Sequence, residues 1–157
     1  MDAPGEQGTL GNLLEQAEQA RDAAQRRLAE AARALRMQRA QATQLDDYRI
    51  ETEERWALQA GRASTPEMML CYRGFMDRLE QAIGQQHHVC AQAERALAHA
   101  REALAACELR VASVRKLIER RQEAVRLAEQ RLDQKRVDEA GQRAAWLQRR
   151  SVDTHHH

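Results

Sequence analysis

The chain has 157 residues and a formal net charge of +1, and 31% of its residues are charged whereas only 3% are aromatic. So few bulky side chains leave little material for a thick globular core, and the prevalence of Ala, Leu, Gln, Glu and Arg is typical of coiled coils. The nearly balanced charge argues against the general electrostatic footprint of a nucleic-acid-binding protein.

The compartment can be inferred from what the chain lacks. No apolar run approaches the roughly 20 residues that a membrane span needs, and residues 1–6 have neither the basic region nor the apolar stretch of a signal peptide. The three cysteines are odd in number and form no CxxC pair, which favours a reducing cytosol. We therefore expect a cytoplasmic protein without direct membrane insertion.

The first predicted element is a helix over residues 10–60, preceded by a disordered N-terminus over residues 1–9. Residues 12–60 contain neither glycine nor proline, and apolar residues recur at alternating steps of three and four. This period of 3.5 residues is typical of a left-handed coiled coil. The apolar positions are Leu10, Leu14, Ala17, Ala24, Leu28, Ala31, Leu35, Ala42 and Leu45, and they are interrupted by Arg21 and Gln38.

A short turn over residues 61–66 ends this helix. Gly61 suits the helix C-cap, because many helices end at a left-handed residue and glycine adopts that conformation without steric cost. Ser64 or Thr65 suits the N-cap of the next helix, with Pro66 in its first turn. One break between two long helices predicts a helical hairpin.

The second helix is predicted over residues 67–150, and residues 151–157 form a tail or tag. The helix has a sustained heptad pattern, so the fold class is all-α, a long antiparallel two-helix coiled-coil hairpin. The apolar seam of this helix consists of Tyr72, Met76, Leu79, Ile83, Cys90, Ala93, Leu97, Ala100, Leu104, Cys107, Val111, Val114, Ile118, Val125, Ala128 and Leu132, with Gln86 and Arg121 as interruptions.

The second helix is also predicted to project past the first. Folding the chain about residue 63 places Leu10 opposite roughly residue 116, so residues from about 118 to 150 form an overhang of roughly 45–50 Å. Residues 115–150 carry 11 basic and 6 acidic side chains, a net charge of +5. A lone helix with an apolar stripe is under-buried, so we expect the overhang to bind a partner. The alternative is an ordinary solvated face of mixed charge.

No catalytic or metal-binding constellation can be recognised. His87 and His88 are adjacent, so they point to different faces of a helix and make no metal pair. Residues 155–157 are histidines that look like part of a purification tag or a natural tail fragment. A two-helix rod also offers no concave site that excludes water from a reacting group. We therefore expect no enzymatic activity, no cofactor and no metal.

Most of the aromatic residues gather around the turn, namely Tyr48, Trp56, Tyr72 and Phe75. Two interpretations remain open for this cluster. The aromatic side chains either plug the tip of a thin coiled coil or form a contact patch, since Tyr and Trp are favoured anchors of protein interfaces.

The residues around the turn resemble a known family. The pattern L-x-x-Y-R, then G-x-x-S, then Y-x-x-F-x-x-x-L-x-x-A-I-x-Q-Q is similar to that of the flagellar export protein FliJ, and residues 133–145 resemble the C-terminal signature of that family. The resemblance spans about residues 10–147. The residues that carry the first pattern are Leu45, Tyr48, Arg49, Gly61, Ser64, Tyr72, Phe75, Leu79, Ala82, Ile83, Gln85 and Gln86.

The resemblance implies a soluble component of the flagellar type III export apparatus, similar in form to the stalk of rotary ATPases. Such proteins insert the end that holds both termini into the ring of the export ATPase FliI. They also contact the export-gate membrane protein FlhA, and they are described as escorts of export chaperones. The implied location is the inner face of the cell membrane at the flagellar basal body.

The resemblance and the overhang together imply two sets of site residues. Thr52 stands where many relatives carry a second aromatic residue, one turn after the tyrosine of the motif. The gate-facing residues would be Gln41, Leu45, Tyr48, Phe75, Leu79, Ala82 and Gln86, of which Leu45, Leu79 and Gln86 also fall on apolar seams and so are candidates for the core. The ring-facing residues would be Arg121, Val125, Arg131, Leu132, Lys135, Arg136, Val137 and Arg143.

Two other functions remain open. One is the equivalent stalk of a virulence-type injectisome, which has the same fold and role in a different machine. The other is a generic coiled-coil scaffold that homodimerises through its overhang. A nucleic-acid-binding rod is disfavoured, because the basic residues alternate with acidic ones and lack aromatic stacking platforms.

Overall fold

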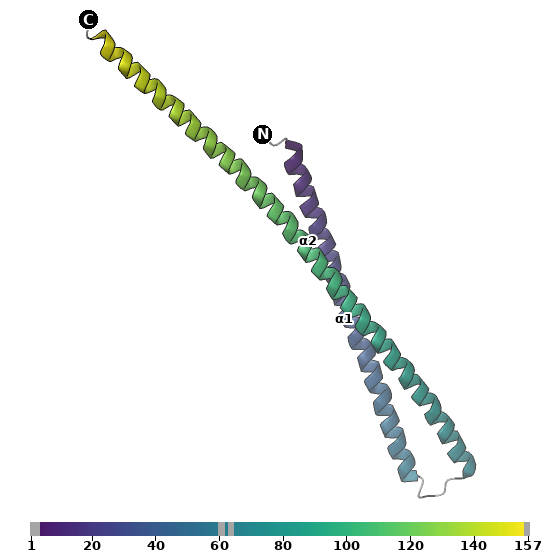
Figure 1. The fold of residues 1–157 in the computed structure, drawn as a ribbon. Coiled ribbons are helices and arrows are strands. Elements are labelled where there is room, and N and C mark those ends of the chain that lie inside the picture. The colour runs from purple at the N-terminus through teal and green to yellow at the C-terminus, as the bar shows by residue number, and fades with distance from the viewer. Residues whose placement is uncertain (1–3, 60–61, 63–64, 156–157) are drawn as a thin grey trace. The chain divides into compact units, whose positions relative to one another are not determined.

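The computed structural model describes residues 4–59, 62 and 65–155. Two helices account for nearly all of the described chain: α1 spans Pro4–Gln59 and α2 spans Pro66–Thr154 (Figure 1). The described residues form no strand. The two helices pack against each other, so the predicted all-α helical hairpin is confirmed.

Helix α1 begins earlier than the sequence predicts. A disordered segment was expected over residues 1–9, but the chain is helical from Pro4 onward. A proline is tolerated here because the first N–H groups of a helix have no acceptor within it. The Thr9 hydroxyl donates a hydrogen bond of 2.7 Å to the Gly5 carbonyl, and Leu10 is buried against α2. Burial of Leu10 anchors these turns and outweighs the weak helix propensity of the neighbouring glycines.

Thr65 acts as the N-cap of α2. Its hydroxyl accepts a hydrogen bond of 3.2 Å from the backbone N–H of Met68, which is one of the N–H groups without an acceptor in the first turn. Pro66 lies in the first turn of the helix, as the sequence predicts. The helix begins at Pro66 and ends at Thr154, which is one residue before and four residues after the predicted bounds of 67 and 150. The other predicted caps, Gly61 and Ser64, lie outside the described residues.

The chain divides into two compact units. One unit comprises residues 18–109 and contains the end of the hairpin with the turn. Within it, α1 and α2 run antiparallel: Arg39 forms an ion pair of 3.2 Å with Glu94, whereas Tyr48, further along α1, contacts Phe75, which comes earlier on α2.

The core of this unit is narrow and follows the predicted seam. Met76, Leu79 and Ile83 are buried together on α2. Leu45, Tyr72 and Phe75 pack against them from both helices and remain half-buried. Only one stripe of each helix faces the other in a two-helix coil, so few side chains lose most of their contact with water.

The polar interruptions of the two predicted seams meet each other. The Gln86 amide nitrogen donates a hydrogen bond of 2.8 Å to the side-chain oxygen of Gln38 and one of 2.9 Å to its backbone carbonyl. Gln86 retains only 9% of its exposure. A buried polar pair at seam positions costs some stability but favours a single register, because any shift of the helices would leave the amide without partners.

The second unit comprises residues 1–17 and 110–157. In it, the first turns of α1 pack against α2, where Leu10, Ala17 and Val111 are buried. Leu10 also lines a small groove of about 220 Å³ together with Ile118. This pairing agrees with the predicted position of Leu10, opposite roughly residue 116.

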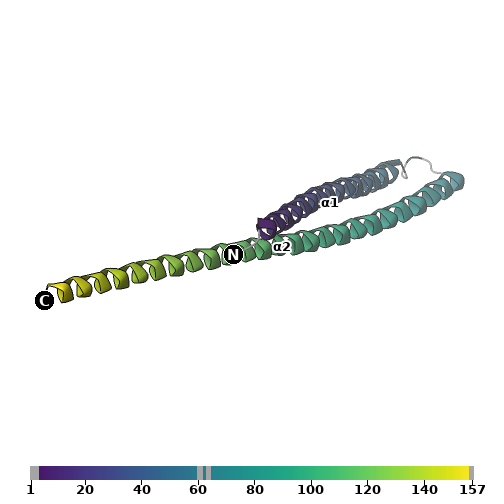
Figure 2. The ribbon, with the colours of Figure 1, turned by 90° about the horizontal axis from the view of Figure 1, so that it is seen from above.

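Residues 126–155, here called the C-terminal segment, comprise the last turns of α2 and His155, and they are exposed along their whole length. In both views, the first turns of α1, which belong to the same unit, do not extend beside the C-terminal end of α2 (Figures 1 and 2). The overhang was predicted to begin at about residue 118, yet Arg121 and Val125 are half-buried. Arg121 lines the same small groove as Leu10, so the first turns of α1 reach further along α2 than the prediction placed them.

Candidate functional site

The aromatic residues near the turn pair across the two helices. The rings of Trp56 and Tyr72 are stacked, with centroids 4.3 Å apart and planes 4° apart. Tyr48 meets Phe75 edge to face, with centroids 6.1 Å apart. Trp56, Tyr72 and Phe75 are half-buried, whereas Tyr48 is 46% exposed. The first three thus close the end of the coil, as the plug interpretation predicts, and Tyr48 remains available to a partner.

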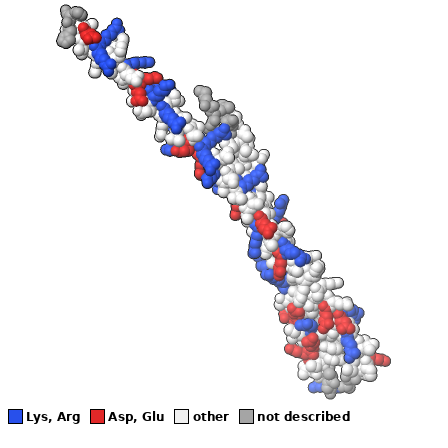
Figure 3. Space-filling view, viewed as in Figure 1, with Lys and Arg blue, Asp and Glu red and all other residues white. Residues whose placement is uncertain are grey.

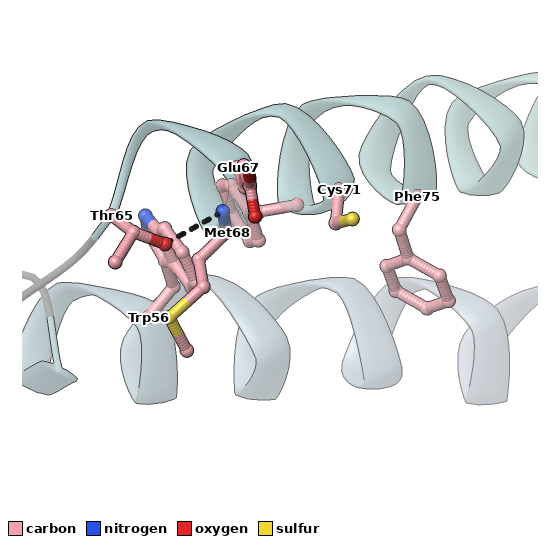
Figure 4. Close-up of a pocket in the computed structure, with 7 residues that line it drawn as sticks. Trp56, Thr65, Glu67, Met68, Cys71 and Phe75 are labelled. Carbon is pink, nitrogen blue, oxygen red and sulfur yellow. Dashed lines mark hydrogen bonds between the residues drawn. The ribbon is translucent and has the colours of Figure 1, made fainter.

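An apolar groove of about 500 Å³ lies beside this cluster, and it was not predicted from the sequence. Figure 4 shows Met68, Cys71 and Phe75 following one another along α2, with Trp56 approaching from α1. The signal that could have revealed the groove is the spacing of three and four residues between these α2 side chains, which places them on one face. The thiol of Cys71 is free and the residue is exposed.

The residues expected to face the export gate differ in how deeply their side chains are buried. Gln41 and Tyr48 are exposed, Leu45, Phe75 and Ala82 are half-buried, and Leu79 and Gln86 are buried. Gln41 precedes Tyr48 by seven residues and Ala82 follows Phe75 by seven, so each pair shares a helix face. The contact between Tyr48 and Phe75 joins these faces into one surface. Leu79 and Gln86 lie beneath it, in the core.

Most of the residues expected to face the ATPase ring are exposed, but they do not share one face. The exposed residues are Arg131, Leu132, Lys135, Arg136, Val137 and Arg143, whereas Arg121 and Val125 are half-buried. At 100° per residue, Leu132, Arg136 and Arg143 lie on one side of α2. Val137 lies about 140° away from Leu132 around the helix axis. A partner that touches all six residues must therefore contact the helix on more than one side.

The side of Leu132 continues to Trp146 and Arg150, which the prediction of ring-facing residues did not include. The guanidinium of Arg150 lies 5.1 Å from the centroid of the Trp146 ring, within the range of a cation–π contact. The spacing of 14 and 18 residues from Leu132 would have placed both on its side of the helix. Figure 3 shows basic side chains distributed along this end of α2.

Two ion pairs of α2, near and within the C-terminal segment, join residues one turn apart and are exposed. Arg136 lies 3.9 Å from Asp133, one turn earlier. Arg126 donates a hydrogen bond to Glu123, and this bond together with the negative charge of the carboxylate raises the pKa of Arg126. Exposed pairs of this kind contribute little to stability. Arg126 and Arg136 therefore remain available to an acidic partner.

The described residues contain neither a cluster of metal-binding side chains nor a candidate membrane span. No group of three or more His, Cys, Asp or Glu side chains among them is arranged to hold a metal ion. Within the same residues, neither helix has an apolar stretch long enough to cross a bilayer.

Comparison with known proteins identifies the family. The family model described as "Flagellar FliJ protein" matches residues 6–150, which include both sides of the turn and most of the C-terminal segment. A search of curated proteins finds no match. The family match confirms the resemblance inferred from the motifs around the turn. At the level of the family, such a protein is an export-related flagellar component and not an enzyme. The chain therefore belongs to the FliJ family of flagellar proteins.

Proposed function

We propose that this chain is the central stalk of the flagellar export ATPase ring, formed by FliI, and that it links the ring to the export-gate protein FlhA. It would work in the cytoplasm at the inner face of the cell membrane and would also escort export chaperones. The observation that carries this proposal is the exposure of the whole C-terminal segment, residues 126–155.

The segment exposes apolar side chains of the kind that helices in folded proteins bury against another element. Leu132 is 53% exposed and Trp146 is 57% exposed, on the same side of α2. Val137 and Val152 are also exposed, on a different side. Helices owe most of their stability to tertiary packing, so these side chains need a partner. Apolar residues on several sides favour a partner that surrounds the helix, as a ring does, over one that covers a single face.

The charge of the segment supports the same partner. Residues 115–150 have a net charge of +5, and the basic side chains alternate with the apolar ones. An acidic ring interior would attract such a helix over a distance and would orient it during association. We therefore assign ring binding to the six exposed residues Arg131, Leu132, Lys135, Arg136, Val137 and Arg143.

We assign gate binding to the surface that carries Tyr48. Tyr48 and Gln41 are exposed on α1, and Phe75 and Ala82 present their half-buried side chains from α2. Leu79 and Gln86 support this surface from the core without reaching a partner. The apolar groove beside Phe75 extends the surface toward the turn and can accept a side chain of the partner.

The stalk role is tested by the rate of ATP hydrolysis of purified FliI, measured with and without the full chain, and by electron microscopy of FliI rings under the same conditions. A stalk that occupies the ring is expected to raise the hydrolysis rate and the fraction of closed rings. Neither quantity would change for a scaffold, which should instead self-associate in analytical ultracentrifugation without FliI.

The gate surface is tested by Tyr48→Ala. An exposed aromatic residue at the centre of an interface commonly contributes about 1.4–3 kcal/mol, so the affinity for FlhA should fall at least about tenfold. The free energy of unfolding should change by less than about 1 kcal/mol, because the Tyr48 side chain is 46% exposed.

Ile50→Ala is the matched control, since Ile50 is 47% exposed on α1 and lies about 160° from Tyr48 around the helix axis. It should leave both the affinity for FlhA and the stability unchanged. Undiminished FlhA binding by Tyr48→Ala would remove this surface from the proposal. Phe75→Ala is less informative, because Phe75 also packs against the buried cluster and its loss should lower affinity and stability together.

A further inference from the structure

A second groove lies on the other side of the Trp56–Tyr72 stack. Both rings line this groove as well as the one beside Phe75. On α2, Cys71 lines only the first groove and Arg73 only the second. Successive helical residues are 100° apart, so these two side chains flank Tyr72 on opposite sides. The second groove has a volume of about 330 Å³ and faces away from the side on which Tyr48 contacts Phe75.

Half of the eight residues that line the second groove are aromatic or methionine, namely Trp56, Tyr72, Met69 and Met76. Met76 is buried, whereas Met69 is 49% exposed. The thioether of methionine is flexible and polarizable, so it packs well against apolar side chains of varied shape. Apolar side chains of this kind suit contact with a protein segment.

The charged side chains that line the groove favour a basic segment. Glu53 lines it from α1, and Asp77 and Glu80 line it from α2. Arg73 is the one basic residue among its lining side chains, which leaves a net charge of −2. In the described part of the chain, no side chain forms an ion pair with any of the three carboxylates. Acidic side chains also gather over this end of the hairpin in the space-filling view (Figure 3).

We propose that this groove binds a basic amphipathic helix of a partner protein, independently of the surface that carries Tyr48. The apolar face of the partner helix would cover Met69 and the aromatic edges, and its Lys or Arg side chains would reach Glu53, Asp77 and Glu80. Asp77 and Glu80 are three residues apart and so lie on one face of α2, as basic residues of the partner would if spaced by three or four. The inference goes beyond the stalk role, because Glu53, Met69, Asp77 and Glu80 belong to neither the gate surface nor the ring surface. Only the Trp56 and Tyr72 rings are shared with the groove beside Phe75.

The test uses Trp56 as the reporter, in the full chain with Trp146→Phe so that Trp56 is its only tryptophan. The probe is a synthetic 18-residue amphipathic helix of Leu and Lys, and the comparison probe has Glu in place of every Lys. The Lys peptide should shift the Trp56 emission in a saturable titration, whereas the Glu peptide should not. Equal binding of the two peptides would overturn the proposal.

The site is located by the triple variant E53Q, D77N and E80Q, which should weaken binding of the Lys peptide about tenfold, because three exposed charge pairs are lost. The matched control is E30Q, E102Q and E108Q, which removes three exposed carboxylates elsewhere in the same unit. It should bind as tightly as the parent chain, and so should Tyr48→Ala. If the two triple variants weakened binding of the Lys peptide equally, the effect would come from the net charge of the chain. That result would overturn the proposed site.

A second copy of the chain is the competing occupant, because its own C-terminal segment is basic and exposes Leu132 and Trp146. Sedimentation equilibrium of the full chain distinguishes the two occupants. A monomer that binds the Lys peptide supports the proposal. Self-association that the first triple variant abolishes and the control variant retains would assign the groove to a second copy and overturn it.

Discussion

Reversing three basic charges of the C-terminal segment, by R131E, K135E and R136E together, is expected to weaken binding to FliI by at least about tenfold at low ionic strength. All three side chains are exposed, so they contribute little to the packing of the folded chain. The reversal would replace their attraction to an acidic ring interior with repulsion. Arg136 forms only a weak exposed pair, 3.9 Å from Asp133. The helical content and the melting temperature should therefore stay close to those of the parent chain.

The binding is measured by titration of FliI at two salt concentrations, because an electrostatic contribution must shrink as salt screens it. The control is R26E, R27E and R33E, which reverses three exposed charges of α1 in the unit of residues 18–109. This control should bind FliI as the parent chain does. If the first triple variant kept full affinity at low salt, the C-terminal segment would not be the ring-binding element.

Leu79→Ala is expected to have the largest effect on stability of any substitution considered. Leu79 is 7% exposed and lies in the buried cluster between Met76 and Ile83. Removing its isobutyl group loses the transfer free energy of the buried carbons and leaves a cavity that two rigid helices close only in part. The free energy of unfolding should fall by about 2–4 kcal/mol, within the range for buried leucines.

The measurement is urea denaturation followed by circular dichroism. Leu58→Ala is the matched control, because Leu58 is 78% exposed and should change the stability by less than about 0.5 kcal/mol. A loss below about 1 kcal/mol at Leu79 would show that the cluster does not hold the hairpin together. The comparison with Tyr48→Ala is also informative, because both residues belong to the family motif. Tyr48→Ala should lower affinity without instability, whereas Leu79→Ala should lower affinity only through instability.

The two glutamines of the seams show which features a local sequence pattern can predict and which it cannot. Gln38 and Gln86 could be recognised as interruptions of two heptad patterns, but nothing in either pattern says that they form hydrogen bonds with each other. Their pairing depends on the register of the helices. Register is a property of the whole interface, because it is set by many seam contacts together.

The candidate surfaces were predictable to different degrees. The proposed ring-facing residues could be named from the sequence as a group, because charge and an uncovered apolar stripe can be read from one helix. The gate surface came from a motif, and a motif does not separate Tyr48, which is exposed, from Leu79, which is buried. The two grooves beside Trp56 and Tyr72 were missed, since a groove needs side chains from both helices.

The sequence by itself determined the two helices, the turn between them and their antiparallel pairing. Helix periodicity is a local property, and so is the N-cap, which the sequence limits to Ser64 or Thr65. A single short break allows no other pairing within one chain. Only the tertiary structure decided where α1 begins and which motif residues reach the surface. Local propensity disfavours a helix near Gly5 and Gly8, and burial of Leu10 against α2 overrides it. Burial near the seam depends on how each helix is rotated toward its partner, and that rotation is set by contacts between residues far apart in the sequence.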